Sequence, residues 1–350
     1  MSSSSFTHLI LHLAPCGIPA IGIGTYKLYG ENCVQSVCSG IRCGFRLIDT
    51  AAGYKNEELV GEGIQKSGVE RSKLFVVVKI LLRAMRSKDE VKESILGSIS
   101  KLRIGYADCV IMHWPGCHGL KPDDHEGNAA ARRRCWEVMI ELQKKGLIRF
   151  IGASNFLPRH FVELEEVSRT LSSGESEGGS PLTKPVLNQI ELHPLCLQED
   201  VLAYCKAHDM IPQQYAPLGE HDARLLAHPR LLELQQTYFP QQTIYDMLIM
   251  WGLAQGFCVL VKSSCEDHHR ANFRAAVDYF ASVRHQRKGF EERSVNESGE
   301  AFGTQEKQSS AFQMAPRLLS DKQLEVIRNL RELMNVKEDT HVCWYSEHIA

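Results

Sequence analysis

The feature that most constrains the fold is an alternation of short apolar runs with longer connecting segments, repeated along most of the chain. The runs are too short for helices and rich in β-branched residues, as in KLFVVVKI at 73–80. Such runs are typical of strands buried on both faces of a parallel sheet. Eight are present, at 18–26, 45–49, 73–80, 108–114, 149–155, 185–190, 210–215 and 257–261.

Helix signals lie in the connections between these runs. Ser87 and Glu90 form a capping-box pattern ahead of an apolar stripe, and Thr243 stands in an N-cap position before a later stripe. Gly146 follows another stripe and is placed to end that helix. Eight such units predict an α/β protein with a closed (β/α)8 TIM barrel rather than a six-stranded open sheet.

The chain has 350 residues, whereas such a barrel needs only about 250. Two polar stretches account for most of the excess: 171–184 is rich in Ser, Gly and Glu, and 283–316 is charged with few aliphatic residues. We interpret both as mobile loop insertions in a single barrel domain spanning 1–350. Beyond them, Ser320 and Gln323 begin a final amphipathic helix.

Composition argues against several classes of partner. The formal net charge of -2 provides no basic excess for nucleic acid. No stretch approaches a membrane span, and the N-terminus lacks the basic region of a signal peptide. The 12 cysteines are scattered without a C-x-x-C pair, which favours free thiols over disulfides or a metal site. We therefore expect a cytoplasmic monomer without a metal.

Polar residues stand at the C-terminal ends of consecutive predicted strands. Asp49 ends the second strand and Tyr54 follows it, while Lys79 and His113 lie near the ends of the third and fourth. In a (β/α)8 barrel this face holds the active site. Taken singly, Asp49 and Lys79 fit a buried ion pair and His113 fits a core histidine. Their joint arrangement favours a catalytic site.

The run GFRLIDTAAGYKNEELVG at 44–61 resembles the first signature of the aldo-keto reductases, and the resemblance extends from residue 18 to about residue 272. It implies that Asp49, Tyr54, Lys79 and His113 form a catalytic tetrad. The implied enzyme reduces small aldehydes and ketones to alcohols by hydride transfer. The implied cofactor is NADPH, with NADH as a second option.

The expected chemistry follows from the residue types. Tyr54 would protonate the carbonyl oxygen as general acid, but a phenol with a pKa of about 10 is a weak acid at neutral pH. We expect the ammonium of Lys79, held by Asp49, to lower that pKa. His113 would orient the carbonyl oxygen. The nicotinamide would supply the hydride, because no side chain can donate one.

The resemblance also implies a series of cofactor contacts. They are Gly24, Thr25, Tyr26 and Asp49 at the nicotinamide; Ser154, Asn155 and Gln189 on its carboxamide; Tyr215 stacked on its ring; Leu218 and Gly219 over the pyrophosphate; and Lys262, Ser263 and Asn272 at the adenosine end.

The sequence departs from the family pattern at the adenosine end. His268 stands where the family has an Arg that pairs with the 2′-phosphate, and Ala271 replaces a Glu that contacts adenine. A neutral His cannot make the bidentate phosphate contact of Arg. We therefore expect a weaker preference for NADPH than the family usually shows, unless Arg270 takes over the phosphate contact.

The expected substrate pocket is aromatic, which suits apolar carbonyl compounds. Its residues are Tyr26, Tyr54, His113 and Trp114. In the C-terminal tail, Trp344 and Tyr345 form a further pocket wall or merely anchor the terminus, and the sequence favours neither.

Two rival interpretations stay open. A family member that keeps the fold and the cofactor without turnover would act as a regulatory or structural binding module, and an intact tetrad does not exclude this. A Rossmann dehydrogenase is less favoured, because Gly22 and Gly24 lack the third glycine of the dinucleotide fingerprint.

Overall fold

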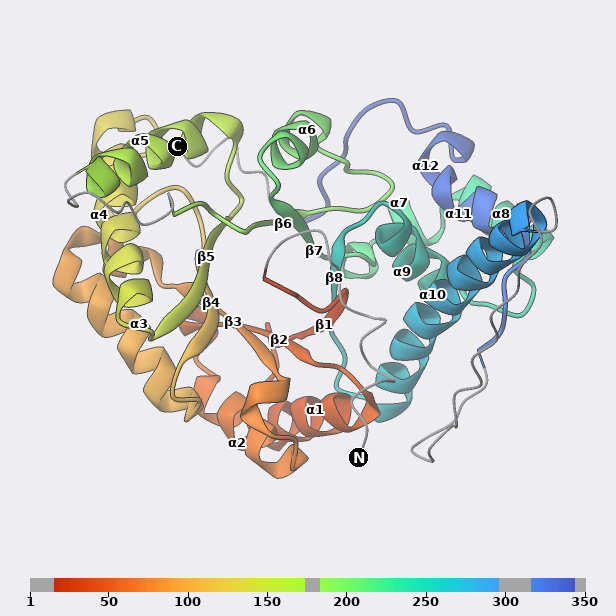
Figure 1. Ribbon diagram of the computed structural model, residues 1–350, viewed down its shortest axis with the longest axis horizontal. Coiled ribbons are helices and arrows are strands. Elements are labelled where there is room, and N and C mark those ends of the chain that lie inside the picture. Colours follow the sequence, from red (N-terminus) through yellow and green to blue (C-terminus); the bar gives the residue numbers. More distant parts are fainter. Residues whose placement is uncertain (1–15, 174–182, 296–315, 344–350) are drawn as a thin grey trace.

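The computed structural model, which describes residues 16–173, 183–295 and 316–343, is a closed barrel of eight parallel strands (Figure 1). The strands follow one another around the barrel in chain order, and β1 pairs with β8 to close it. The predicted (β/α)8 fold is confirmed. The strands are β1 (Ile21–Gly24), β2 (Leu47–Ala51), β3 (Phe75–Ile80), β4 (Ala107–Met112), β5 (Ile148–Ser154), β6 (Leu187–Glu191), β7 (Ile211–Tyr215) and β8 (Cys258–Val261).

Helices lie around the outside of the barrel (Figure 1). They are α1 (Gly30–Cys43), α2 (Glu57–Ser67), α3 (Lys88–Leu102), α4 (His125–Lys144), α5 (Pro158–Ser173), α6 (Glu199–Ala207), α7 (Ala223–Leu226), α8 (Pro229–Tyr238), α9 (Ile244–Ala254), α10 (Glu266–Val295), α11 (Asp321–Arg328) and α12 (Leu330–Leu333).

Local sequence signals set the ends of several helices. The Ser87 side chain accepts a hydrogen bond from the Glu90 backbone N–H at the start of α3. Thr243 begins α9 with a full capping box. Gly146 adopts a φ of 74° directly after α4, a conformation that favours glycine. The predicted final helix is present, but it breaks at Asn329 into α11 and α12.

Helix α1 has no counterpart among the helix signals noted in the sequence. Its buried side includes Cys33, Val37, Cys38 and Ile41. Cysteine packs as a small hydrophobic residue when it is buried. In the sequence, these cysteines were treated only as candidate disulfide or metal residues. The apolar stripe to which they belong was therefore not recognised as a helix.

The structure also differs from the predicted loop at 283–316. Helix α10 continues to Val295, so the first part of that stretch is helical. Ala276, Tyr279 and Ser282 are buried on the side of this helix that packs inward. Residues 296–315, like 174–182 of the other predicted insertion, lie outside the described residues.

The structure also bears on the expectations about membrane spans and cysteines. Among the helices described here, none is long and apolar enough to cross a membrane. The twelve cysteines are free thiols in the structure, and most of them are buried.

Candidate active site

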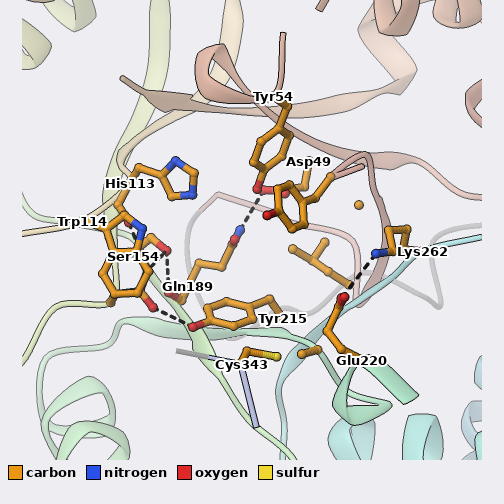
Figure 2. Close-up of a pocket in the computed structure, with 15 residues that line it drawn as sticks. Asp49, Tyr54, His113, Trp114, Ser154, Gln189, Tyr215, Glu220, Lys262 and Cys343 are labelled. Carbon is orange, nitrogen blue, oxygen red and sulfur yellow. Dashed lines mark hydrogen bonds and ion pairs between the residues drawn. The ribbon is translucent and has the colours of Figure 1, made fainter. Parts of the chain in front are cut away.

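A cavity opens at the C-terminal end of the barrel, where the sequence places the candidate residues (Figure 2). Its walls come from strand ends and from the loops that follow them. The lining residues are Gly24, Tyr26, Asp49, Tyr54, His113, Trp114, Ser154, Asn155, Gln189, Tyr215, Ala216, Glu220, Leu260, Lys262 and Cys343.

The four predicted tetrad residues lie together. Lys79 forms an ion pair with Asp49, and its Nζ also donates a hydrogen bond of 3.1 Å to the phenol oxygen of Tyr54. The Tyr54 ring stands edge-on to His113, with 5.7 Å between the ring centroids. Asp49 and Lys79 are 3% and 1% exposed, so the ion pair is shielded from solvent.

The strand register explains why these side chains meet. Ala51 on β2 is the register partner of Lys79 on β3. Asp49 lies two residues before Ala51 and therefore points to the same face of the sheet as Ala51 and Lys79. The chain then forms a short 3-10 turn, Ala52–Tyr54, which brings the Tyr54 phenol within reach of the Lys79 ammonium.

The electrostatics of the tetrad correct one expectation. Burial, with the nearby Asp49 carboxylate, raises the pKa of Tyr54 well above its usual value. Burial lowers the pKa of Lys79, and Asp49 opposes that shift. Because the Lys79 charge is matched by Asp49 at closer range, the ion pair presents little net positive charge to the phenol. The pKa of Tyr54 thus shifts in the direction opposite to the one that we expected, because burial and Asp49 outweigh the hydrogen bond from Lys79, and the phenol is protonated at neutral pH.

His113 is neutral in this environment. Burial, with a further contribution from the Lys79 charge, lowers the pKa of His113 to about 3. Its backbone carbonyl accepts a hydrogen bond of 3.0 Å from Asn155 Nδ2, which ties the end of β4 to the end of β5. A neutral imidazole can donate one hydrogen bond and accept another.

The residues expected at the nicotinamide carboxamide form a connected network. Ser154 Oγ donates to the backbone carbonyl of Gln189 at 2.8 Å, and Asn155 Nδ2 donates to Ser154 Oγ at 3.1 Å. The hydroxyl of Tyr215 donates to Asn155 Oδ1 at 2.9 Å. Figure 2 shows the Tyr215 ring across the cavity from Tyr54. An aromatic face beside these amides fits a flat ring that carries a carboxamide.

The four residues expected at the nicotinamide divide into two groups: those that line the cavity, which include Asp49, and one that does not. Gly24 and Tyr26 line the cavity, and the Tyr26 ring centroid lies 5.0 Å from that of Tyr54. Thr25 is fully buried instead, and its hydroxyl donates to the backbone carbonyl of Asp49 at 3.0 Å. Thr25 supports the end of β2 and does not line the cavity.

At the predicted phosphate end, Lys262 already has an acidic partner. Lys262 Nζ lies 3.3 Å from Glu220 Oε1 (Figure 2), and Lys27 lies 3.9 Å from the other oxygen of Glu220. Leu218 and Gly219, the residues expected over the pyrophosphate, directly precede Glu220 in the chain. The two lysines and Glu220 connect the loops after β1, β7 and β8 at one side of the cavity.

The remaining adenosine-end residues lie on or before α10. Ser263 Oγ is 3.3 Å from His268 Nδ1, so these two predicted contacts do meet. Arg270 instead pairs with Glu266 one turn earlier in the helix. Asn272 is buried, 7% exposed. The structure thus brings His268 to Ser263, which is predicted to bind the phosphate, and turns Arg270 toward Glu266.

Sequence reasoning missed four residues that line the cavity: Ala216, Glu220, Leu260 and Cys343. The position of Glu220 could have indicated a place at the cavity, because it directly follows Leu218 and Gly219, which were predicted to contact the cofactor. Cys343 directly precedes Trp344 and Tyr345, and these two aromatic residues lie outside the described part of the chain.

The tail that carries Cys343 is attached to the end of β6. The buried Glu191 carboxylate accepts hydrogen bonds from the backbone N–H groups of Val342 and Cys343 at 2.7 and 3.0 Å. It also contacts His193 and His341 at 3.0 and 3.1 Å. Burial by itself would raise the pKa of Glu191. These hydrogen bonds outweigh burial and hold the pKa well below its usual range.

A closed parallel barrel with a Tyr–Lys–Asp–His cluster at its C-terminal mouth defines a class of carbonyl-reducing oxidoreductases, and comparison with known proteins agrees. Residues 20–279 match the model of the Aldo/keto reductase family, and the chain belongs to that family.

Among its curated relatives is a glycerol 2-dehydrogenase (NADP(+)) of Saccharomyces cerevisiae, 32% identical over 76% of this chain and 86% of the relative. A methylglyoxal reductase of Escherichia coli is 32% identical over 73% of this chain and 83% of its own length. A crystal structure of a Bombyx mori aldo-keto reductase in complex with NADP superposes with a TM-score of 0.59 at 26% identity, covering 75% of this chain and 89% of the other.

Proposed function

We propose that this protein is an NADPH-dependent reductase of small aldehydes and ketones, of the aldehyde or aldose reductase type, with Tyr54 as general acid. The observation that carries the proposal is the hydrogen bond from Lys79 Nζ to the Tyr54 oxygen at the cavity wall. Because that oxygen accepts from Lys79, the phenol hydrogen is directed elsewhere and is available to a carbonyl oxygen in the cavity.

The cavity suits a nicotinamide cofactor, which when bound supplies the hydride that no side chain can provide. Tyr215 would pack against the ring, while Ser154, Asn155 and Gln189 would bind the carboxamide. Lys262 and Ser263 would bind the 2′-phosphate. The relatives support NADP(H) as the cofactor, since the yeast dehydrogenase carries NADP(+) in its name and the Bombyx mori enzyme was crystallised with NADP.

Tyr54 and His113 share the work at the substrate oxygen. The raised pKa of Tyr54 keeps the phenol protonated until negative charge develops on that oxygen. Neutral His113, edge-on to the phenol, would donate a second hydrogen bond there. Lys79 stabilises the phenolate left behind, and Asp49 holds Lys79 in place. Substrate would enter past Tyr26 and Trp114, which line the cavity.

The direct test is oxidation of NADPH by purified protein with an aromatic aldehyde such as 4-nitrobenzaldehyde, followed at 340 nm. We expect turnover by the natural protein, and a fall of about 10²- to 10⁴-fold in Tyr54→Phe, the usual range for removing a general acid. Cofactor affinity should change little. Tight NADPH binding without turnover on a broad carbonyl panel would instead favour a binding module.

A further inference from the structure

At the base of the candidate active site, two amide side chains and a thiol occupy a layer of the barrel interior that branched aliphatic residues usually fill. They are Gln189 on β6, Gln213 on β7 and Cys258 on β8, which are register partners on consecutive strands. Their exposed fractions are 2%, 0% and 0%. Polar groups buried this deeply are costly unless they are hydrogen-bonded to one another.

These side chains form one chain of hydrogen bonds that ends on the tetrad. Gln189 Nε2 donates to Asp49 Oδ1 at 2.7 Å and to Gln213 Oε1 at 2.6 Å (Figure 2 shows Gln189 reaching toward Asp49). Gln213 Nε2 donates to Cys258 Sγ at 3.3 Å. Cys258 Sγ donates in turn to the backbone carbonyl of Pro19 at 3.3 Å.

The chemistry of its two ends fixes the direction of this chain. The Asp49 carboxylate and the Pro19 carbonyl can only accept hydrogen bonds. Gln189 must therefore turn its NH2 group toward Asp49, and Gln213 must present its oxygen to Gln189. Both amide hydrogens of Gln189 are then used, which leaves the Gln189 oxygen as the atom to face a ligand. Gln213 thus determines the orientation of the Gln189 amide, and with it which Gln189 atom faces the cavity.

The next residue along β7 provides an internal comparison. Gln214 is also 0% exposed, but it points to the opposite face of the strand, as successive strand residues do. Its amide donates to the backbone carbonyl of Leu192 at 2.7 Å. Gln214 is therefore a buried glutamine of the same strand without a link to Asp49 or Gln189.

We propose that Gln213 is a positioning residue for carbonyl reduction. It holds the Gln189 amide, and through Gln189 it fixes the Asp49 carboxylate that pairs with Lys79 beneath Tyr54. Without the Gln213 oxygen, one buried hydrogen of Gln189 has no acceptor, and the amide rotates away from the orientation that serves Asp49 and the cofactor. This proposal rests on the proposed function.

Three variants test it: Gln213→Met, which keeps the length without the amide; Gln214→Met, the matched control on the other face; and Gln213→Glu. The last variant keeps an acceptor oxygen toward Gln189. We would measure kcat and KM with NADPH and 4-nitrobenzaldehyde, the Kd of NADPH by fluorescence, the pH profile of kcat, and thermal unfolding.

We expect Gln213→Met to lower kcat about tenfold and to weaken NADPH binding at least threefold. Gln214→Met should leave kcat and the Kd of NADPH within about twofold of the natural protein. We expect this even if Gln214→Met lowers the melting temperature as much as Gln213→Met does. Gln213→Glu should restore most of kcat at neutral pH, and should lose it at alkaline pH as the introduced carboxyl group ionises beside Asp49.

Equal effects of the two methionine variants, or wild-type kcat and Kd in Gln213→Met, would overturn the proposal. If the natural protein binds NADPH but reduces no carbonyl compound, the proposed function fails separately. The Kd comparison between Gln213→Met and Gln214→Met then decides whether Gln213 positions Gln189.

Discussion

The two ends of the candidate cofactor site are built differently. At the nicotinamide end, Asp49, Lys79 and Gln189 are at least nine-tenths buried, and their polar atoms are paired within the barrel. At the adenosine end, His268 is exposed and Lys262 is partly exposed, and Lys262 is paired with Glu220 at the surface. Strand register fixes the side-chain geometry of the buried end. The geometry of the exposed end is set by loop and helix-end residues, whose ion pairs can be exchanged at little cost in free energy.

This difference indicates where substitutions should have large effects. Removing one member of a buried ion pair leaves an uncompensated charge, which proteins tolerate poorly. Removing a surface cation affects mainly the ligand that it binds. The five predictions below test this contrast.

The largest effect is expected for Lys79→Met. It leaves the Asp49 carboxylate buried and unpaired, which should reduce the free energy of unfolding by about 3–5 kcal/mol and abolish turnover. Urea denaturation measures the loss. The double variant Asp49→Leu/Lys79→Met should recover most of the stability but no activity. A single variant as stable as the natural protein would show that the pair is not tightly buried.

A smaller effect is expected for Lys262→Met. A charged hydrogen bond to phosphate contributes about 1.5–3 kcal/mol, so NADPH should bind about tenfold to a hundredfold more weakly while NADH binding is unchanged. Lys27→Met is the matched control, because Lys27 contacts the same Glu220 but does not line the cavity. Equal losses for the two cofactors would argue against a phosphate contact at Lys262.

An effect in the opposite direction is expected for His268→Arg. Restoring a bidentate donor beside Ser263 should tighten NADPH binding about tenfold without helping NADH. The ratio of the two Kd values measures it. Arg270→Gln should change that ratio little, because Arg270 pairs with Glu266. A large loss in Arg270→Gln would mean that Arg270 has taken over the phosphate contact.

The smallest effect is expected for pH. His113 stays neutral down to about pH 3 and Tyr54 stays protonated well above its usual pKa, so kcat should vary less than about threefold between about pH 5 and 9. A steep acid limb near pH 6.5 would mean that His113 titrates normally.

Stability should respond to the same histidine. The unfolded chain binds a proton at His113 near pH 6.5, whereas the folded chain does so only near pH 3. The unfolded state therefore binds more protons in this window, and the free energy of unfolding should fall as the pH falls from 6.5 toward 3. His113→Gln should show a shallower fall in urea denaturation across that range.

Much of the fold was predictable because most strands, such as β3 and β4, are apolar runs that are buried along their length, although β6 and β7 carry polar residues. The grouping of Asp49, Tyr54, Lys79 and His113 followed from their places at the strand ends, since parallel strands bring those ends to one edge. Their roles, and the cytoplasmic monomer, stay predictions. Helix α1 was missed because two residues of its buried face, Cys33 and Cys38, are cysteines.

Other features depend on contacts that local sequence does not encode. The direction of the Tyr54 pKa shift depends on the burial of its phenol and on the nearby Asp49 carboxylate, which a motif cannot supply. The ion pair of Lys262 with Glu220 joins loops after different strands. Cys343 reaches the cavity through hydrogen bonds to Glu191, a residue 152 positions earlier in the chain.

The attachment of the C-terminal tail has a consequence for how this enzyme scaffold can change. Glu191 holds Val342 and Cys343 by their backbone amides, so any amino acid except proline can occupy these two positions without losing the anchor. The side chain at position 343 can therefore change one wall of the cavity while Tyr54 and His113 stay in place. Under the proposed function, we expect substitutions at Cys343 to change substrate selectivity and to affect the barrel little.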